Sequence, residues 1–265
     1  GCVILPVYRL FYPNKQLITN IDGLEHKRQK WPRIVKKFLK LSEKMAVKFS
    51  NKIIADNYII QKYIENEYGR SSFLIAYGGD HTYQKILKEE VKEKYNLPDK
   101  YAFKVCRIEP ENNIKLILNS FSKTYLPLVI VGNWNNNKYA KELKQKYSNF
   151  SNLYLLEAIY CGNILNQIRS NCYIYIHGHS AGGTNPSLVE AMNLGLPIFA
   201  FDVPYNRATT FNKAKYFKTE DDLIKLIQET NIHELDKISN EMLDKAQNEY
   251  KWETISKKYL DLLLK

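Results

Sequence analysis

Two patterns of apolar positions alternate along the chain. Short apolar runs, typical of strands buried on both faces, stand between longer segments whose apolar residues repeat at helical spacing. The strand-like runs lie at 2–7, 16–21, 52–55, 72–77, 101–107, 126–131, 153–156, 172–176, 196–201 and 214–217. The helical segments lie at 32–50, 58–68, 113–123, 138–147, 163–170, 187–194, 220–229, 233–250 and 252–264. This alternation predicts an α/β fold with parallel sheets covered by helices.

The stretch 172–202 is the most informative part of the chain. A buried strand leads into a loop of small residues from His177 to Thr184, and Asn185-Pro186 then starts a helix. Asn is a good N-cap, and Pro fits the first helical position. A glycine loop at the carboxyl end of a strand is where doubly wound sheets bind ligands. An anion placed there meets loop N–H groups and the positive end of a helix dipole.

Composition places the chain among ordinary globular proteins. Of 265 residues, 45% are hydrophobic and 25% charged. No apolar run reaches the roughly 20 residues that a membrane-spanning helix needs, and we find no signal peptide. Four cysteines without a C-x-x-C pairing predict free thiols in a reducing cytosol. We therefore expect a cytoplasmic protein.

Basic residues outnumber acidic ones by 39 to 28, and most of the surplus lies in 27–52. The helix predicted there, 33–50, has two interpretations. Its lysines form a solvated face opposite a packed apolar face that includes Ile34 and Phe38. Alternatively, the helix docks on the anionic inner face of the cytoplasmic membrane. Nucleic-acid binding is not expected, because no recognised nucleic-acid module accompanies the charge.

Gly178-His179-Ser180-Ala181-Gly182 matches the G-x-S-x-G nucleophile elbow of serine hydrolases, and Asp202 or Asp221 and then His233 follow in the hydrolase order. That elbow requires a helix that begins at the serine, whereas the helix here begins at Asn185-Pro186. No H-G-G-G segment for an oxyanion hole precedes it. A serine hydrolase therefore stays as an alternative, and a non-catalytic basic module that binds a membrane or polyanion is another.

Other cofactor motifs are absent from the sequence. No G-x-G-x-x-G follows a strand, and the glycine loop has no lysine before Thr184, which excludes the NAD fingerprint and the Walker P-loop. The five histidines form no metal set with carboxylates at ligand spacing. Neither an organic cofactor nor a metal ion is expected.

Two charged residues suit a nucleotide ligand. Arg107 ends the first strand after the charged segment 81–98, where a guanidinium suits bidentate contacts with a diphosphate. Glu190 sits among apolar neighbours on the helix that follows the glycine loop, and a carboxylate in such a place needs a hydroxyl or cation partner. A surface salt bridge for Arg107 and a solvated position for Glu190 remain the simpler interpretations.

Together these residues resemble a family. Arg107 with Pro110-Glu111-Asn112-Asn113, and the glycine loop that leads into NPSLVEAM (185–192), are similar to the retaining GT-B glycosyltransferases of family 4. Three stretches resemble more closely the bacterial rhamnosyltransferase branch that builds capsule and cell-wall polysaccharides. These stretches are NIDGLEHKRQKW (20–31), HGHSAGGTNPSLVEAM (177–192) and FDVPYNRATT (201–210).

The resemblance implies a GT-B fold, with two Rossmann-like domains and the active site between them. Residues 1–97 would be the carboxyl-terminal part of the acceptor-side domain, and 98–250 the domain that binds the nucleotide-sugar donor. The terminal helix, 251–265, would pack back toward the first domain. Because the chain starts at Gly1, inside the strand predicted for 2–7, we expect a missing amino-terminal piece that carries much of the acceptor site.

The resemblance also implies site residues. Asp22 and Glu25 would face the cleft as catalytic, acceptor-side groups, Arg107 would hold the donor diphosphate, and Glu190 would bind a hydroxyl of the nucleotide's sugar. The remaining donor-binding positions are Asn112, Gly182, Gly183, Thr184, Asn185 and Ser187. The sequence departs from the general pattern at two of them. Asn112 replaces a usual lysine, and Gly182 replaces the first glutamate of an E-x7-E pair.

The implied reaction moves a hexose, rhamnose in this branch, from a donor such as dTDP-rhamnose to a lipid-linked oligosaccharide acceptor. The leaving nucleoside diphosphate gains charge in the transition state, and loop N–H groups with Arg107 are placed to stabilise it without a metal ion. Closure of the two domains would exclude water.

Overall fold

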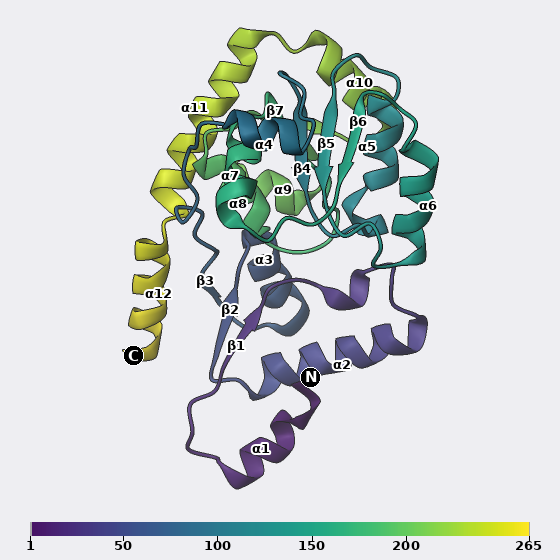
Figure 1. Ribbon diagram of the computed structural model, residues 1–265. Helices are drawn as coiled ribbons and strands as arrows, with labels where there is room; N and C mark the ends of the chain where they lie inside the picture. The colour runs from purple at the N-terminus through teal and green to yellow at the C-terminus, as the bar shows by residue number, and fades with distance from the viewer. Residues whose placement is uncertain (1, 265) are drawn as a thin grey trace.

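Two parallel sheets organise the molecule in a computed structural model that describes residues 2–264 (Figure 1). The smaller sheet has the order β1-β2-β3, with β1 (Ile18–Ile21), β2 (Lys52–Ala55) and β3 (Phe73–Leu74). Neighbouring strands run parallel, so the carboxyl ends of all three meet at one edge. Residues that follow β1 and β2 are therefore brought together at that edge.

The larger sheet has six parallel strands in the order β6-β5-β4-β7-β8-β9. They are β4 (Ala102–Val105), β5 (Leu128–Val131), β6 (Leu153–Leu156), β7 (Ile174–His177), β8 (Ile198–Phe201) and β9 (Lys215–Phe217). The chain moves outward from β4 to β6 and then returns to the other side of β4 with β7. This is the doubly wound order of dinucleotide-binding folds, in which ligands bind outside the carboxyl ends of the two strands where the direction reverses. Here those strands are β4 and β7.

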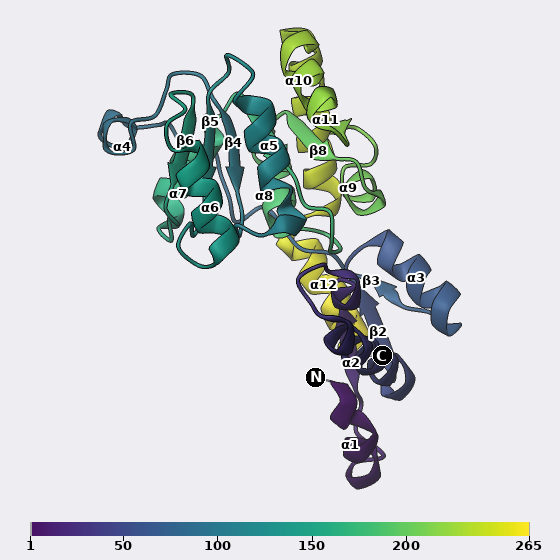
Figure 2. The same ribbon diagram turned by 90° about the vertical axis from the view of Figure 1, so that its right-hand side faces the viewer.

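Helices cover both faces of the larger sheet (Figures 1 and 2). Their bounds are α1 (Leu5–Phe11), α2 (Arg33–Phe49), α3 (Tyr58–Tyr68), α4 (Glu89–Lys94), α5 (Ile114–Phe121), α6 (Lys138–Tyr147), α7 (Gly162–Ser170), α8 (Pro186–Asn193), α9 (Pro204–Thr209), α10 (Glu220–Glu229), α11 (Ile232–Glu249) and α12 (Trp252–Leu264). Local sequence sets several of these ends. Thr219 and Asn231 form capping boxes at the starts of α10 and α11, and Gly69 ends α3 with a left-handed φ of 62°.

Alternate strand residues of the larger sheet enter two separate cores. Phe103, Val129 and Tyr175 pack on one face with side chains of α7, α8 and α11. Their neighbours Ala102 and Leu128 pack on the other face with α5, α6 and α10. Because both faces are covered, the strands are apolar at consecutive positions. The predicted fold class is confirmed.

The smaller sheet also has helices on both sides. Residues of α2 and α3 cover one side, and α12 covers the other, where Ile255 and Leu262 pack with Ile54 and Ile75. Figure 2 shows α12 running from the end of α11 along this sheet. The last helix thus crosses from the larger sheet to the smaller one. The predicted domain boundary at residue 98 stays a prediction.

The strand predicted for 2–7 is wrong, because residues Cys2–Ile4 form a 3-10 helix and Leu5–Phe11 form α1. Pro6 lies in the first turn of α1, where its missing N–H is harmless, whereas a strand would need that donor. Within that run, Ile4 and Val7 are 65% and 49% exposed. The run is therefore apolar without being buried by the described residues.

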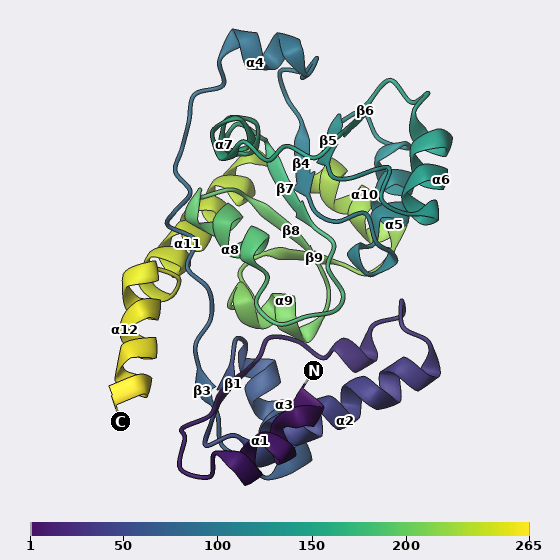
Figure 3. The same cartoon turned by 60° about the horizontal axis from the view of Figure 1, so that its bottom comes forward.

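The packed face predicted for the basic helix is only partly correct. The second half of α2 buries Ala46 and Val47, but Ile34 is 82% exposed and Phe38 is 49% exposed. The first turns of α2 extend past the smaller sheet (Figure 3). The 3-10 helix Glu25–Lys27 contacts α2 but leaves Ile34 exposed. Helical spacing alone did not distinguish the two halves. The sequence interpretation also missed α9 and gave no separate helix for α4.

Candidate functional site

A cavity of about 230 Å³ lies at the carboxyl ends of β4 and β7, where the order of the larger sheet reverses. Its walls come from both sheets and from α9, which contacts α3 (Figure 3). From the smaller sheet come Asp22, Arg28, Asp56 and Tyr77. From the larger sheet and α9 come Arg107, Glu111, Asn112, His179, residues 181–186, Tyr205 and Asn206. Most of the predicted site residues are thus brought together.

Arg107 follows β4 and is exposed at the cavity. Among residues 2–264 its guanidinium makes no hydrogen bond or ion pair, so it is available to a ligand. Asn112 donates from its side chain to the carbonyl oxygen of Arg107, at 2.5 Å. The Asn112 side chain therefore fixes the backbone of Arg107. It does not supply the positive charge of the lysine that usually occupies this position.

The glycine loop leads into α8 as predicted. Asn185 is the N-cap of α8, and its Oδ1 accepts from the backbone N–H of Ser187 at 3.1 Å and from the Ser187 hydroxyl at 2.7 Å. Ser187 is thus part of the cap and is not among the residues that line the cavity. Gly182 adopts a φ of 136°, which favours glycine. Within the described chain, the N–H groups of Gly182 and Gly183 have no acceptor.

Thr184 makes a different contact from the one predicted. Its N–H donates to Oδ2 of Asp56 at 3.0 Å, and its hydroxyl donates to the backbone oxygen of Asp56 at 2.6 Å. Asn57 donates to Oγ1 of Thr184 at 3.3 Å. The loop is therefore tied to the smaller sheet through the residues that follow β2, and the N–H of Thr184 is already occupied.

Asp56 is the functional candidate that the sequence interpretation missed. Only 1% of its surface is exposed, and burial together with the nearby Asp22 carboxylate raises its pKa to about 8. Asp22 follows β1 and Asp56 follows β2, which is the neighbouring parallel strand. Asp22 was selected through the family resemblance. The strand-end position that pointed to Arg107 would have pointed to Asp56 as well, because Asp56 directly follows β2.

Only one of the two residues predicted to be catalytic lies at the cavity. Asp22 lines the cavity, whereas Glu25 does not. Glu25 pairs with Nε of Arg28 at 2.6 Å and accepts from the Trp31 indole at 3.2 Å. Its carboxylate thus holds Arg28, which does line the cavity. Glu25 therefore contributes to the site only by positioning Arg28.

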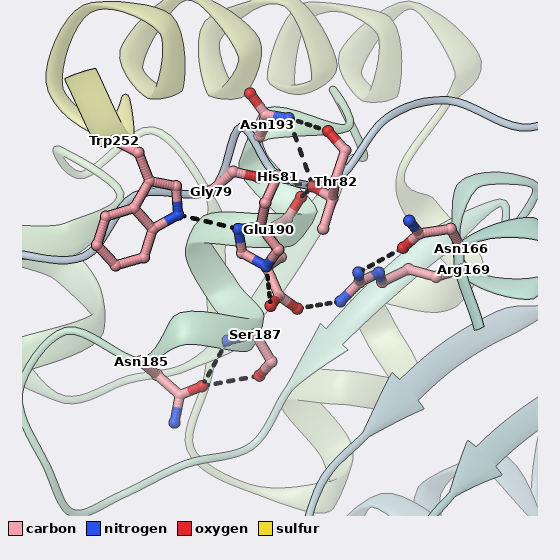
Figure 4. A network of polar contacts seen from close by, with 10 residues as sticks. All are labelled: Gly79, His81, Thr82, Asn166, Arg169, Asn185, Ser187, Glu190, Asn193 and Trp252. Atoms are coloured by element: carbon pink, nitrogen blue, oxygen red, sulfur yellow. Dashed lines mark hydrogen bonds and ion pairs between the residues drawn. The ribbon is translucent and has the colours of Figure 1, made fainter. Parts of the chain in front are cut away.

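Glu190 points away from the cavity wall into a polar network (Figure 4). Its Oε2 forms an ion pair with Arg169, which is buried, and its Oε1 lies 3.0 Å from Nε2 of His81. Arg169 also donates to the side chain of Asn166 at 2.8 Å. The Glu190 carboxylate is therefore paired with a cation, as expected for a carboxylate among apolar neighbours.

Two stacked histidines lie at the start of the glycine loop, where β7 ends. The rings of His177 and His179 are 4.5 Å apart between centroids, and Lys104 on β4 is buried nearby without a hydrogen-bond partner among the described residues. Burial lowers the pKa of Lys104, and burial together with neighbouring cations lowers the pKa of both histidines well below its usual range. The histidines are thus neutral at physiological pH.

The serine hydrolase arrangement does not form. Ser180 donates its hydroxyl to the carbonyl oxygen of Glu111 at 2.9 Å, and α8 begins only at Pro186. Asp202 is paired with Arg207. No histidine is hydrogen-bonded to Ser180 within the described residues, so the nucleophile, base and orienting acid are not assembled.

Residues 2–264 contain no group of three or more His, Cys, Asp or Glu side chains arranged to hold a metal ion. None of the helices in that range is long and apolar enough to cross a membrane.

Solved structures of known proteins share this fold. The chain aligns over 98% of its length with 70% of a sucrose-phosphate synthase from Thermosynechococcus elongatus, at a TM-score of 0.80 and 15% identity. It aligns over 99% with 76% of the Anabaena protein Alr3699/HepE in complex with UDP-glucose, at a TM-score of 0.80 and 14% identity. It also aligns over 94% with 50% of TarM, at a TM-score of 0.72 and 19% identity. These likenesses establish the GT-B fold.

Family profiles match nearly the whole chain. Residues 10–80 match a domain of unknown function, DUF1972, and residues 87–258 match "Glycosyl transferases group 1". No curated protein matches the sequence. The second profile spans more than half of the chain and covers the β4–β7 cavity wall, the glycine loop and α8. The chain therefore belongs to the group 1 family of glycosyltransferases.

Proposed function

We propose that the chain transfers a sugar from a nucleoside-diphosphate donor, and that the donor diphosphate binds in the cavity between β4 and β7. One observation carries this proposal. The guanidinium of Arg107, which has no partner among the described residues, and the amino-terminal end of α8 line the same cavity. They lie at the strand ends where doubly wound sheets bind nucleotides. An anion there meets a cation, a helix dipole and the N–H groups of Gly182 and Gly183.

The groups that would bind the diphosphate would also favour the transfer of the sugar. Negative charge develops on the leaving diphosphate in the transition state, and fixed donors stabilise it without reorganising. Asp22 lines the cavity from the end of β1 in the smaller sheet and is the candidate acceptor-side residue. We propose that the reaction needs no metal ion and that it retains the configuration of the transferred sugar.

Relatives of the same fold support a nucleotide-sugar donor. The HepE structure contains UDP-glucose, and a pneumococcal O-GlcNAc transferase contains UDP and GlcNAc. For this chain we propose rhamnose from a dTDP donor. The support is the resemblance of 20–31, 177–192 and 201–210 to polysaccharide rhamnosyltransferases. The structure brings parts of all three stretches to the cavity, through Asp22, the glycine loop and Tyr205.

We propose a growing, lipid-linked surface polysaccharide as the acceptor, reached from the inner face of the cytoplasmic membrane. Helix α2 supports this proposal, because Ile34, Phe38 and Leu41 are exposed among its lysines. Exposed apolar side chains flanked by cations suit an anionic lipid surface better than a simple solvated face does.

The experiment that tests the donor proposal is calorimetric titration of the chain with dTDP, UDP and GDP. We expect dTDP to bind most tightly and Arg107→Ala to weaken it by about tenfold or more, since a charged hydrogen bond is worth roughly 1.5–3 kcal/mol. Arg33→Ala, which removes an exposed arginine from α2, is the matched control and should bind as the unaltered chain does. Preference for UDP or GDP would retain the glycosyltransferase and reject rhamnose. Absence of binding would reject the donor site.

A further inference from the structure

The carboxyl group of Asp56 is the contact that joins the smaller sheet to the glycine loop. Its Oδ2 accepts the N–H of Thr184 at 3.0 Å, while its backbone oxygen accepts the Thr184 hydroxyl at 2.6 Å. Asn57 adds bonds to Thr184 and to Thr209 on α9. Two consecutive residues, Asp56 and Asn57, thus bond to one loop position, Thr184. The loop that we assign to the donor phosphates follows a strand of the larger sheet, but residues after a strand of the smaller sheet hold it in place.

The loop is also shaped to fit this carboxyl group. A Cβ atom added to Gly183 would lie 1.9 Å from Oδ1 of Asp56 and 2.5 Å from its Cγ, so no side chain fits at that position. Oδ1 is itself buried and has no hydrogen-bond partner among the described residues. Glycine at 183 is therefore explained by close approach of Asp56, because its φ is not in the left-handed region.

We propose that Asp56 is a positioning residue for the donor: in its neutral, protonated form it holds the loop Gly182–Thr184 in the conformation that receives the donor diphosphate. This inference rests on the proposed function. A neutral carboxyl group accepts the N–H of Thr184 without placing a negative charge beside the diphosphate. An ionised one adds that charge a short distance from where the phosphates would bind, and so weakens donor binding.

The surroundings of Asp56 favour the neutral form at physiological pH. Burial, and then the Asp22 carboxylate, raise its pKa to about 8. The other charged groups in the donor cavity are Arg28, Arg107 and Glu111. Glu249 and Lys258 line a second cavity, which Asp56 also borders.

Uncharged titratable groups also face Asp56. The phenols around it are those of Tyr58, Tyr77, Tyr205, Tyr250 and Tyr259. Burial raises the pKa of Tyr77 to about 12 and that of Tyr250 above its usual range, so these two stay neutral up to pH 9. His179 is neutral over the same range, because burial lowers its pKa. The charge that changes between pH 7 and 9 is therefore assigned to Asp56.

The test is calorimetric titration with UDP and with dTDP at pH 7 and pH 9, for the whole chain and three variants. The terminal phosphate of both probes has a pKa near 6, so it is already about nine-tenths ionised at pH 7 and its charge changes little up to pH 9. Asp56→Asn keeps the shape and the acceptor for Thr184 but cannot ionise. Asp56→Ala removes the acceptor, and Asp236→Asn alters an exposed acid on α11 as a control.

We expect the unaltered chain and Asp236→Asn to bind about tenfold more weakly at pH 9 than at pH 7. Asp56→Asn should bind at pH 7 within about threefold of the unaltered chain and lose the pH dependence, which a merely structural role would not predict. Asp56→Ala should bind weakly at both pH values, because the N–H of Thr184 is left unpaired.

An affinity that is independent of pH in the unaltered chain, or the same pH dependence in Asp56→Asn, would overturn the inference while leaving the donor site intact. If Asp56→Ala binds normally while folded, the positioning role is also wrong. If the unaltered chain binds neither nucleotide at any pH, the proposed function fails, and this inference fails with it.

Discussion

Trp252 fixes the tautomer of His81. The indole Nε1 of Trp252 lies 3.1 Å from Nδ1 of His81, and an indole nitrogen can only donate. Nδ1 of His81 is therefore the acceptor, and the ring carries its proton on Nε2, which donates to Oε1 of Glu190 at 3.0 Å. Figure 4 shows this chain of contacts from the start of α12 to the middle of α8.

The first prediction concerns Glu190, whose two oxygens are already occupied by His81 and Arg169. Glu190→Ala should lower the free energy of unfolding by about 3 kcal/mol, because it leaves the buried Arg169 guanidinium without its partner. Urea denaturation measures this loss. Glu142→Ala, which removes an exposed glutamate of α6, should change stability by less than about 0.5 kcal/mol. If both variants change the free energy of unfolding by equally small amounts, the Glu190 network contributes little to stability.

The second prediction concerns the pH dependence of stability. Asp56 has a folded pKa of about 8 against an ordinary value of 3.8. Between these values the folded state holds a proton that the unfolded state has released, so this contribution is complete below pH 4 and is lost as pH rises to 8. The unaltered chain should lose stability over this range relative to Asp56→Asn. Denaturation of both proteins at pH 5 and pH 8 measures the difference, and parallel curves would contradict it.

The third prediction separates the transferase from a serine hydrolase. Ser180 donates to a backbone carbonyl and is hydrogen-bonded to no base within residues 2–264, so Ser180→Ala should keep donor binding and lose only about 1 kcal/mol of stability. A fluorophosphonate probe should leave Ser180 unlabelled in the folded chain. Labelling of Ser180, with loss of activity, would restore the hydrolase interpretation.

The fourth prediction concerns metal ions. Arg107, the end of α8 and the loop N–H groups supply the positive field for a diphosphate, so EDTA should leave dTDP affinity unchanged. Calorimetry with and without added Mg²⁺ measures this. A tenfold or greater increase in dTDP affinity with Mg²⁺ would show that the ion helps to bind the diphosphate.

The fifth prediction concerns helix α2 at a membrane. Ile34→Ser together with Phe38→Ser should reduce binding to anionic phosphatidylglycerol vesicles, because the exposed apolar contact is lost. Raised salt should reduce binding further by screening the lysines. Ile86→Ser alters another exposed apolar residue, outside α2, and serves as the control in a vesicle sedimentation assay. Equal binding by all three proteins would reject the membrane surface.

The larger sheet was predictable because its signals are local. Strands such as 153–156 are apolar at consecutive positions, and helices such as 138–147 and 220–229 begin at caps that the sequence shows directly. The Asn185-Pro186 start of α8 and the strand-end Arg107 placed one wall of the cavity by the same local reasoning.

The smaller sheet was less predictable because its burial depends on non-local contacts. Residues 2–7 are apolar enough for a strand, yet they form helices with exposed side chains, since no described strand pairs beyond β1. Asp56 was missed for a related reason. Its partners Thr184 and Asp22 are distant in sequence, and only the fold brings them together.

The most direct test of the donor site is a crystal structure of the chain with dTDP. We expect phosphate oxygens within about 3 Å of the Arg107 guanidinium and of the loop N–H groups before α8. The carboxyl group of Asp56 should still accept the N–H of Thr184. A nucleotide bound elsewhere, with Arg107 in solvent, would contradict the central claim.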